Sequence, residues 1–177
     1  MGKPTEPNPV KLFIGLLIGN PDILPEVGDK LEDRFGRRDC ESPVIPFDYT
    51  DYYNQQMGPE IKRKFISFEK LIDPGELASI KIWTNEVEEL FSNRSDQELP
   101  RPINIDPGYV GLSKLVLATT KNYSHRLYLG SGIYGEVTLQ YRSGEYKPQP
   151  WTYPDYKSEE YLEFFARVRK KYCRQLE

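Results

Sequence analysis

The chain has 177 residues, of which 38% are hydrophobic and 29% are charged, and it has a net charge of −3. This size and composition are those of one globular domain, and the charge argues against a general nucleic-acid-binding protein. We predict a single domain over residues 10–177 after a flexible N-terminus at residues 1–9. No apolar run reaches the roughly 20 residues that span a bilayer. We therefore expect a cytoplasmic protein with no membrane partner.

The charges are distributed unevenly along the chain. Residues 1–100 contain 12 Lys and Arg against 19 Asp and Glu, whereas residues 101–177 contain 12 against 8. This difference reflects either solvated faces or an electropositive half that meets an anionic ligand. The two cysteines, Cys40 and Cys173, match neither a zinc site nor a disulfide framework. Two reduced thiols are the default expectation, with a single bridge as the alternative.

Strands and helices alternate in the first part of the chain. The apolar run at residues 11–18 predicts a strand that is buried on both faces. A four-residue spacing of apolar side chains predicts a helix over about residues 23–35, which Gly36 ends. Residues 43–47 and 62–70 predict two strands, and the prolines of the first favour an edge or a bulge. Asp73, Pro74 and Glu76 form a capping-box-like start to a helix that runs to about Asn93.

The second part of the chain begins with a short predicted strand at residues 103–105. Asp106-Pro107-Gly108-Tyr109 then has the composition of a turn. Apolar residues between 112 and 119 predict a helix over residues 112–121. Residues 126–129 and 133–141 predict an antiparallel hairpin. Residues 148–154 are expected to be extended, and a last helix begins near Ser158.

The order of these elements predicts the fold class. Up to Asp106 the order is strand, helix, strand, strand, helix, strand, which is typical of a ferredoxin-like βαββαβ arrangement. We therefore predict an α+β protein with a ferredoxin-like core. A C-terminal helix, β-hairpin and helix would extend that core.

Three residues are candidates for catalysis. His125, the one imidazole of the chain, suits a general base or a metal ligand, or it simply bonds the backbone. Asp106 follows a predicted strand, where sites gather, although turns also favour Asp. Glu136 interrupts an apolar strand and would need a cation or a metal if it faced inward. The three together could ligate one divalent metal ion, although their spacing matches no known metal motif.

Five further residues are candidates for ligand binding. Lys114, near the start of a predicted helix, and Arg126, beside His125, are expected to contact an anion. Aromatic side chains suit the stacking of a base or ring, or the packing of a core: Tyr109, Tyr134 and Trp151. The sequence contains no phosphate-binding Walker A loop and no nucleophile elbow.

Two functions fit these residues. The first is a small cytoplasmic enzyme or binding protein for a phosphate-bearing, nucleotide-like ligand, with its site around residues 106–136. The alternative is a non-catalytic module that docks on a protein or RNA through Tyr-rich surfaces, including Tyr49, Tyr52 and Tyr53. The first function, as assigned to these residues, requires His125, Arg126 and Asp106 to lie near one another. A flat exposed aromatic patch with no concave pocket would favour the second.

Several segments also resemble a known family. They lie at residues 106–109, 114–119, 125–126, 128–130, 132–134, 136–139 and 151–156, and residues 11–19, 47–50 and 84–85 are similar too. They are similar to a bacterial family known only as domain of unknown function 4416, and the resemblance covers nearly the whole chain. Gly135 departs from the pattern, where a small residue such as Ala is expected. Some of its members are labelled GTP-binding proteins, but this sequence contains neither a P-loop nor a guanine-reading NKxD motif. The family supplies no established catalytic residues, so the resemblance implies no site.

Overall fold

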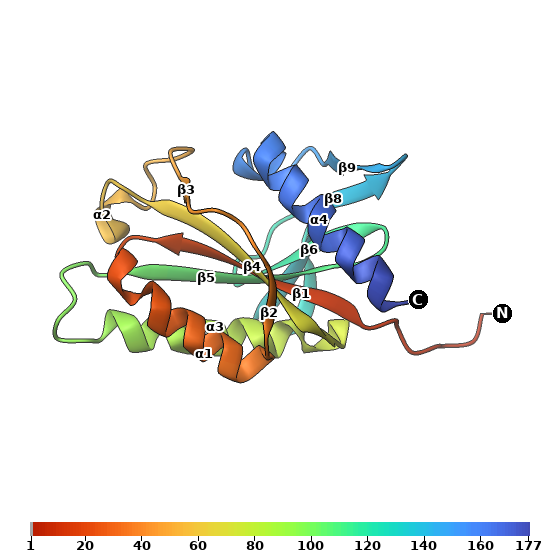
Figure 1. The fold of residues 1–177 in the computed structure, drawn as a ribbon, viewed down its shortest axis with the longest axis horizontal. Helices are drawn as coiled ribbons and strands as arrows, with labels where there is room; N and C mark the ends of the chain where they lie inside the picture. The colour runs from red at the N-terminus through yellow and green to blue at the C-terminus, as the bar shows by residue number, and fades with distance from the viewer. Residues whose placement is uncertain (1) are drawn as a thin grey trace.

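The computed structural model describes residues 2–177, which form a nine-stranded sheet with helices on both faces (Figure 1). The strands are β1 (Val10–Ile18), β2 (Arg38–Glu41), β3 (Ile45–Pro46), β4 (Lys62–Ile72), β5 (Ile103–Val110), β6 (Lys114–Thr119), β7 (Leu127–Gly130), β8 (Ile133–Arg142) and β9 (Glu145–Pro148). The helices are α1 (Leu24–Phe35), α2 (Asn54–Met57), α3 (Leu77–Ser92) and α4 (Glu159–Gln175).

The predicted α+β class is confirmed, with a sheet larger than expected. The strand order is β2-β4-β1-β5-β6-β8-β7, with β3 also beside β4 and β9 also beside β8. All of these pairs are antiparallel. The sheet therefore runs through almost the whole length of the chain, from Val10 to Pro148.

Helices α1 and α3 cover one face of the sheet, which is the lower face in Figure 1. Alternate residues of β1, from Leu12 to Ile18, pack against both helices. The predicted stripe of α1 is buried, and the helix ends at Gly36, whose φ of 83° suits a glycine. The predicted capping box at Asp73 is also confirmed, because Asp73 and Glu76 bond each other's backbone N–H groups at the start of the α3 region.

Helix α4 covers the opposite face. Phe13, Phe65 and Leu139 of the sheet pack against its aromatic stripe. Their rings meet closely, since the centroid of Phe13 lies 4.8 Å from that of Phe165. Strand β1 is therefore buried on both faces, as its continuous apolar sequence predicts.

Two sequence predictions in the middle of the chain are wrong. Residues 112–121 are not a helix, because Lys114–Thr119 form β6. Leu115 packs with the α4 face and Val116 with the α3 face, so burial on both faces removed the alternation that identifies a strand. The predicted turn at Asp106-Pro107-Gly108-Tyr109 is also wrong, because β5 continues through it to Val110.

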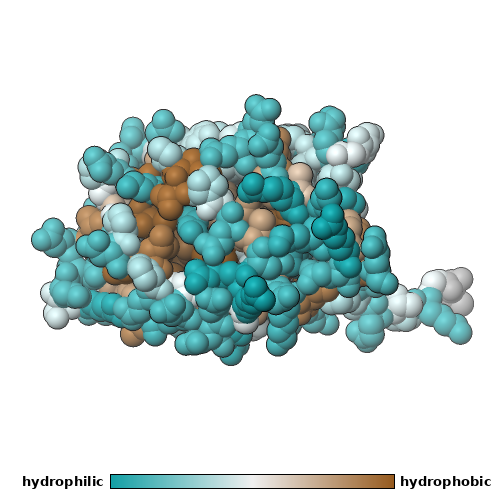
Figure 2. Space-filling view, in the orientation of Figure 1, coloured by the Kyte–Doolittle hydropathy of each residue, from teal (hydrophilic) through white to brown (hydrophobic). Residues whose placement is uncertain are grey.

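The remaining differences are small. The strand predicted at residues 43–47 is shortened to β3, at the edge of the sheet as expected. Figure 2 shows an apolar area near β3, and the adjoining β2–β3 segment includes the exposed Val44. The sequence did not predict β2, β9 or the one-turn helix α2. Within residues 2–177, no helix has both the length and the apolar character needed to cross a bilayer.

Candidate functional site

The sheet opens between β5 and β6. These strands pair at Gly108↔Leu117, Tyr109↔Val116 and Val110↔Leu115, and the ladder stops at Gly108. The backbone of Ile105 faces the opening, where its N–H donates to Glu88 Oε1 (2.8 Å) and its carbonyl accepts from Lys81 Nζ (3.0 Å). Pro107 follows two residues later, so it faces the same way and has no N–H to extend the ladder.

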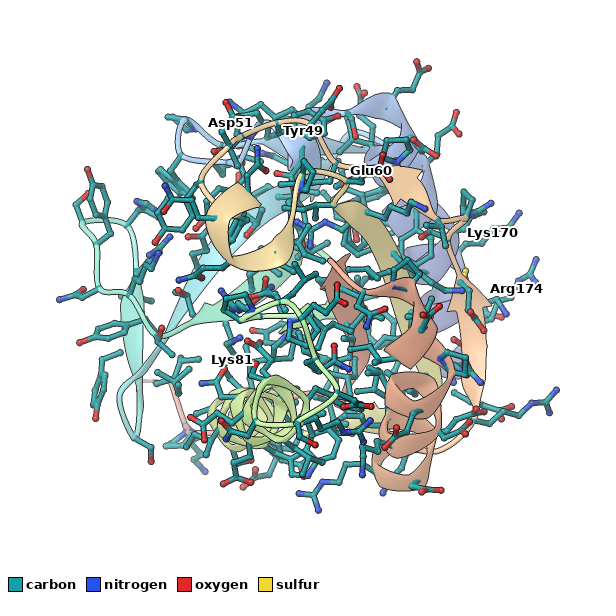
Figure 3. The ribbon with its side chains drawn as sticks, turned by 90° about the vertical axis from the view of Figure 1, so that its left-hand side faces the viewer. Tyr49, Asp51, Glu60, Lys81, Lys170 and Arg174 are labelled. Atoms are coloured by element: carbon teal, nitrogen blue, oxygen red, sulfur yellow. The ribbon has the colours of Figure 1, made fainter. Side chains whose placement is uncertain are left out.

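A cavity of about 960 Å³ occupies this opening, and we call it the β5–β6 cavity. Its walls come from β4, β5, β8, residues 81–92 of α3, and residues 47–56, 100–101, 117–121 and 153–156. In Figure 3, Lys81 lies on α3 at the bottom of the view, and Tyr49 and Asp51 lie on the loop before α2 at the top. The volume is within the range of small-molecule sites, which is roughly 300–1,000 Å³.

One wall carries a network around Lys81, whose side chain is buried. Lys81 Nζ lies 3.0 Å from Asp106 Oδ1 and 3.7 Å from Glu88 Oε1. Asn104 donates to the other oxygen of Asp106 (2.5 Å), and Arg101 donates to both Asn104 and Glu88. The network therefore links α3 to the free edge of β5 and lines the cavity with alternating cations and carboxylates.

The pKa values of the two carboxyl groups in this network are shifted in opposite directions. Burial would raise the pKa of Asp106, but the charges of Lys81 and Arg63 and the bonds from Lys81 and Asn104 outweigh it and lower that pKa. Burial dominates for Glu88 and raises its pKa, despite the nearby charges of Lys81 and Arg101. At neutral pH Asp106 is therefore a firmly ionised acceptor facing the cavity.

The opposite wall carries a network around Glu136, which is only 2% exposed. Glu136 Oε2 lies 3.1 Å from His125 Nε2 and 2.8 Å from Arg126 Nε. Because a carboxylate only accepts hydrogen bonds, His125 donates from Nε2. Arg126 Nη2 also donates to the hydroxyl of Tyr153 (2.7 Å). Burial, followed by the charge of Glu136, raises the pKa of Tyr153, so this phenol stays protonated.

Arg63 lies at the floor of the cavity and is only 5% exposed. Its Nη2 donates to Asp155 Oδ2 at 2.9 Å. Among the described residues, however, its Nε and Nη1 have no hydrogen-bond partner, and neither do the buried hydroxyls of Tyr156 and Tyr161. Gly15 of β1 makes room for this guanidinium, because a Cβ there would lie 3.3 Å from Nη1. Unpaired buried donors cost about 1–3 kcal/mol each.

The structure separates the predicted catalytic residues. Asp106 and Glu136 both line the β5–β6 cavity, but they belong to different networks. His125 lies behind Glu136 and lines a second, more open hollow, where it stacks on Trp151 with a centroid distance of 5.0 Å. In residues 2–177 no group of three or more His, Cys, Asp or Glu side chains is placed to hold a metal. Asp106, His125 and Glu136 therefore do not form the metal site considered above.

The predicted ligand-binding residues are also dispersed. Arg126 reaches the cavity through Glu136 and Tyr153. Lys114 is exposed at the first position of β6 and does not begin a helix, so its predicted role at a helix N-terminus is wrong. Tyr109 packs against the core on the α3 face. Tyr134 stays on β8 beside Tyr128, with centroids 5.4 Å apart.

The residues that sequence reasoning missed lie in regular elements. Lys81 and Glu88 are seven residues apart within the buried stripe of α3, and a pair of charges in an apolar stripe is a usable signal. Arg63 is likewise a charged residue at a buried position of β4. Asn104, Arg101 and Tyr153 gave no such signal, because their roles depend on the opening between β5 and β6.

Comparison with known proteins places the chain in a family. A family model described as a domain of unknown function (DUF4416) matches residues 8–172. No curated protein and no solved structure matches the chain. Since the match covers nearly all of the 177 residues, the chain belongs to the DUF4416 family.

Proposed function

We propose that this protein binds a small phosphate-bearing, nucleotide-like ligand in the β5–β6 cavity, as an enzyme or as a binding protein. One observation carries the proposal: cationic side chains from four separate segments converge on a single concave cavity that also has a tyrosine-rich wall. The cations are Arg63, Lys81, Arg101 and Lys121, and the tyrosines are Tyr49, Tyr52, Tyr53, Tyr153 and Tyr156. The first three cations are paired with carboxylates of the same lining, which contains Glu88, Glu89, Asp106, Glu136 and Asp155. Phosphate groups are typically bound by such cations, and rings by such aromatic faces.

The outer part of the cavity is suited to capture a ligand. Within the described chain, Lys121 has no carboxylate at ion-pair distance, and its Nζ lies 5.1 Å from the centroid of the Tyr52 ring. Tyr52 is 68% exposed and Tyr49 is 42% exposed. A cation and accessible rings therefore lie side by side at the mouth, which favours a ligand with both an anionic group and a planar ring.

The inner carboxylates have a different role in the proposal. Asp106 and Glu136 hold cations in place, and Asp106 also presents a charged acceptor toward the cavity. Such an acceptor suits the hydroxyl groups of a sugar. His125 is too far back to touch the ligand, so we assign it a positioning role through its bond to Glu136.

The proposal is tested by calorimetry and thermal unfolding with nucleotides, sugar phosphates and inorganic phosphate. A ligand at about 100 times its Kd should stabilise the protein by about 2.7 kcal/mol, or roughly 5–10 °C. Lys121→Ala should weaken binding, whereas Lys114→Ala, a lysine outside the cavity, should not. Absence of binding by every phosphate compound, or an equal loss in both variants, would contradict the proposal.

A second candidate function is docking on another macromolecule, favoured by a separate observation at the sheet edge. Strand β7 pairs only with β8 among the described strands, and its Leu127, Tyr128 and Leu129 are all exposed, Leu127 by 75%. Two leucines on an edge favour a protein partner over RNA. Partner binding that survives Lys121→Ala but is lost in Leu127→Lys would support docking instead of ligand binding.

We further propose that β1, α1, β2, β4, α3 and β5 form a ferredoxin-like core. The strand order β2-β4-β1-β5 with antiparallel neighbours supports this arrangement. The free thiols of Cys40 and Cys173 support a reducing compartment such as the cytoplasm.

A further inference from the structure

We propose that the phosphoryl group of the ligand binds at the floor of the β5–β6 cavity, on Arg63, Tyr156 and Tyr161, an inference that rests on the proposed function. Arg63 and Tyr156 line this floor, and the ring of Tyr161 lies beside that of Tyr156, with centroids 5.8 Å apart. The Lys121 end of the cavity would then receive the rest of the ligand.

The first argument is the number of unused donors. Arg63 Nε, Arg63 Nη1 and the hydroxyls of Tyr156 and Tyr161 are buried and lack partners within residues 2–177. Buried polar groups are nearly always hydrogen-bonded, and an exception calls for a bound water, ion or ligand. The four groups come from β4, the segment after β9, and α4, so their convergence depends on the tertiary fold. A group with several acceptor oxygens would satisfy them together.

The second argument is that Arg63 is already fixed in place. Asp155 takes one end of its guanidinium through Nη2. The guanidinium lies over the rings of Phe47 and Phe65, and its Cζ is 5.2 Å and 5.4 Å from their centroids. A guanidinium held this way loses little freedom on binding, which strengthens a bond to an anion. Asp155 also neutralises Arg63 while the site is empty, so the floor does not hold an isolated buried charge.

The third argument selects a phosphoryl group over a carboxylate. A carboxylate offers two oxygens in one plane and can engage one edge of a guanidinium. The candidate donors here come from three elements, because Arg63 lies on β4, Tyr156 follows β9 and Tyr161 lies on α4. A tetrahedral group with three free oxygens can accept hydrogen bonds from more of these donors than a planar carboxylate can.

The test uses variants that remove only an unpaired hydroxyl. Tyr156→Phe deletes no hydrogen bond within the protein, and Tyr161→Phe removes only a weak contact with Arg63, so both variants should unfold close to the wild-type temperature. Tyr146→Phe is the matched control, because Tyr146 is also buried with an unpartnered hydroxyl, but neither it nor its ring neighbour Tyr141 lines the cavity, whereas Tyr161 lies beside the lining residue Tyr156. Calorimetry would measure binding of inorganic phosphate, acetate and a nucleoside monophosphate to all four proteins.

We expect phosphate and the monophosphate to bind wild type and Tyr146→Phe equally, and to bind each of the other two variants about tenfold more weakly, since each loses one bond to an anion. Acetate should bind at least tenfold more weakly than phosphate. If the monophosphate binds all four proteins alike, the floor site is wrong while the proposed function stands. If no phosphate compound binds wild type, both proposals fail. Equal weakening in Tyr146→Phe also overturns the floor site.

Discussion

Replacing Lys81 by Met tests the network that closes the free edge of β5. The change removes the donor to the Ile105 carbonyl and to Asp106, and it leaves Glu88 without its nearest cation on α3. Breaking a buried ion pair costs roughly 3–5 kcal/mol. Because the Asp106 side chain is 32% exposed, we expect the lower end, about 3 kcal/mol. That loss corresponds to a fall in Tm of roughly 6–12 °C for a chain of this size.

The assay is urea unfolding followed by circular dichroism at several pH values. The folded-state pKa of Asp106 is lowered, so its contribution is complete above its unfolded pKa, about 3.9, and is lost as the pH falls through the lower folded value. Lys81→Met lacks this contribution, so its deficit should be largest at neutral pH and should shrink below about pH 4. Protonation of Glu88 acts in the same direction. Lys114→Met, at an exposed position, should change stability by less than about 0.5 kcal/mol. A deficit under about 1 kcal/mol at pH 7, or one that does not depend on pH, would refute the reasoning.

Three further predictions concern the packing and stability of the fold. Gly108→Ala should destabilise the protein by about 3 kcal/mol or prevent folding, because the new Cβ would lie 2.5 Å from Phe13 Cζ. Gly111→Ala should be tolerated, because the atom nearest to its new Cβ lies 3.7 Å away. The yield of folded protein and the Tm of the two variants check this prediction. Asp73→Ala should cost about 1 kcal/mol through loss of the capping box, and a larger loss in urea unfolding would contradict a purely local effect. Burial raises the pKa values of Tyr146, Tyr156 and Tyr161 above the ordinary phenol range, so alkaline difference spectra should show late-ionising tyrosines, with one fewer in Tyr146→Phe than in wild type.

The long helices α1, α3 and α4 were predictable from sequence because each keeps one apolar stripe. The stripe of α1, the capping box of Asp73 and the start of α4 at Ser158 were all visible in single-sequence patterns. The hairpin of β7 and β8 was predictable for a similar reason, since glycines separate its strands. These patterns depend only on residues close together in the sequence, so they can be identified without knowledge of the tertiary fold.

The strands at the centre of the sheet were not predictable in the same way. Strand β6 is buried on both faces, so its sequence lacks the alternation that would have separated it from a helix. Pro107 indicated a turn, yet it is accommodated in a strand because its missing N–H faces the opening. The site depends on that opening, so Arg63, Arg101 and Tyr153 could not be grouped before the fold was known.

Beyond the proline of β5, only a short ladder joins the two halves of the sheet. Strands β2, β4, β1 and β5 lie on one side of that ladder, and β6, β8 and β7 lie on the other. The ladder pairs β5 from Gly108 to Val110 with β6. Arg63 and Asp106 lie in the first half, and Lys121 and Glu136 lie in the second. A ligand that contacts both halves would therefore connect them where the backbone hydrogen bonds between β5 and β6 are missing.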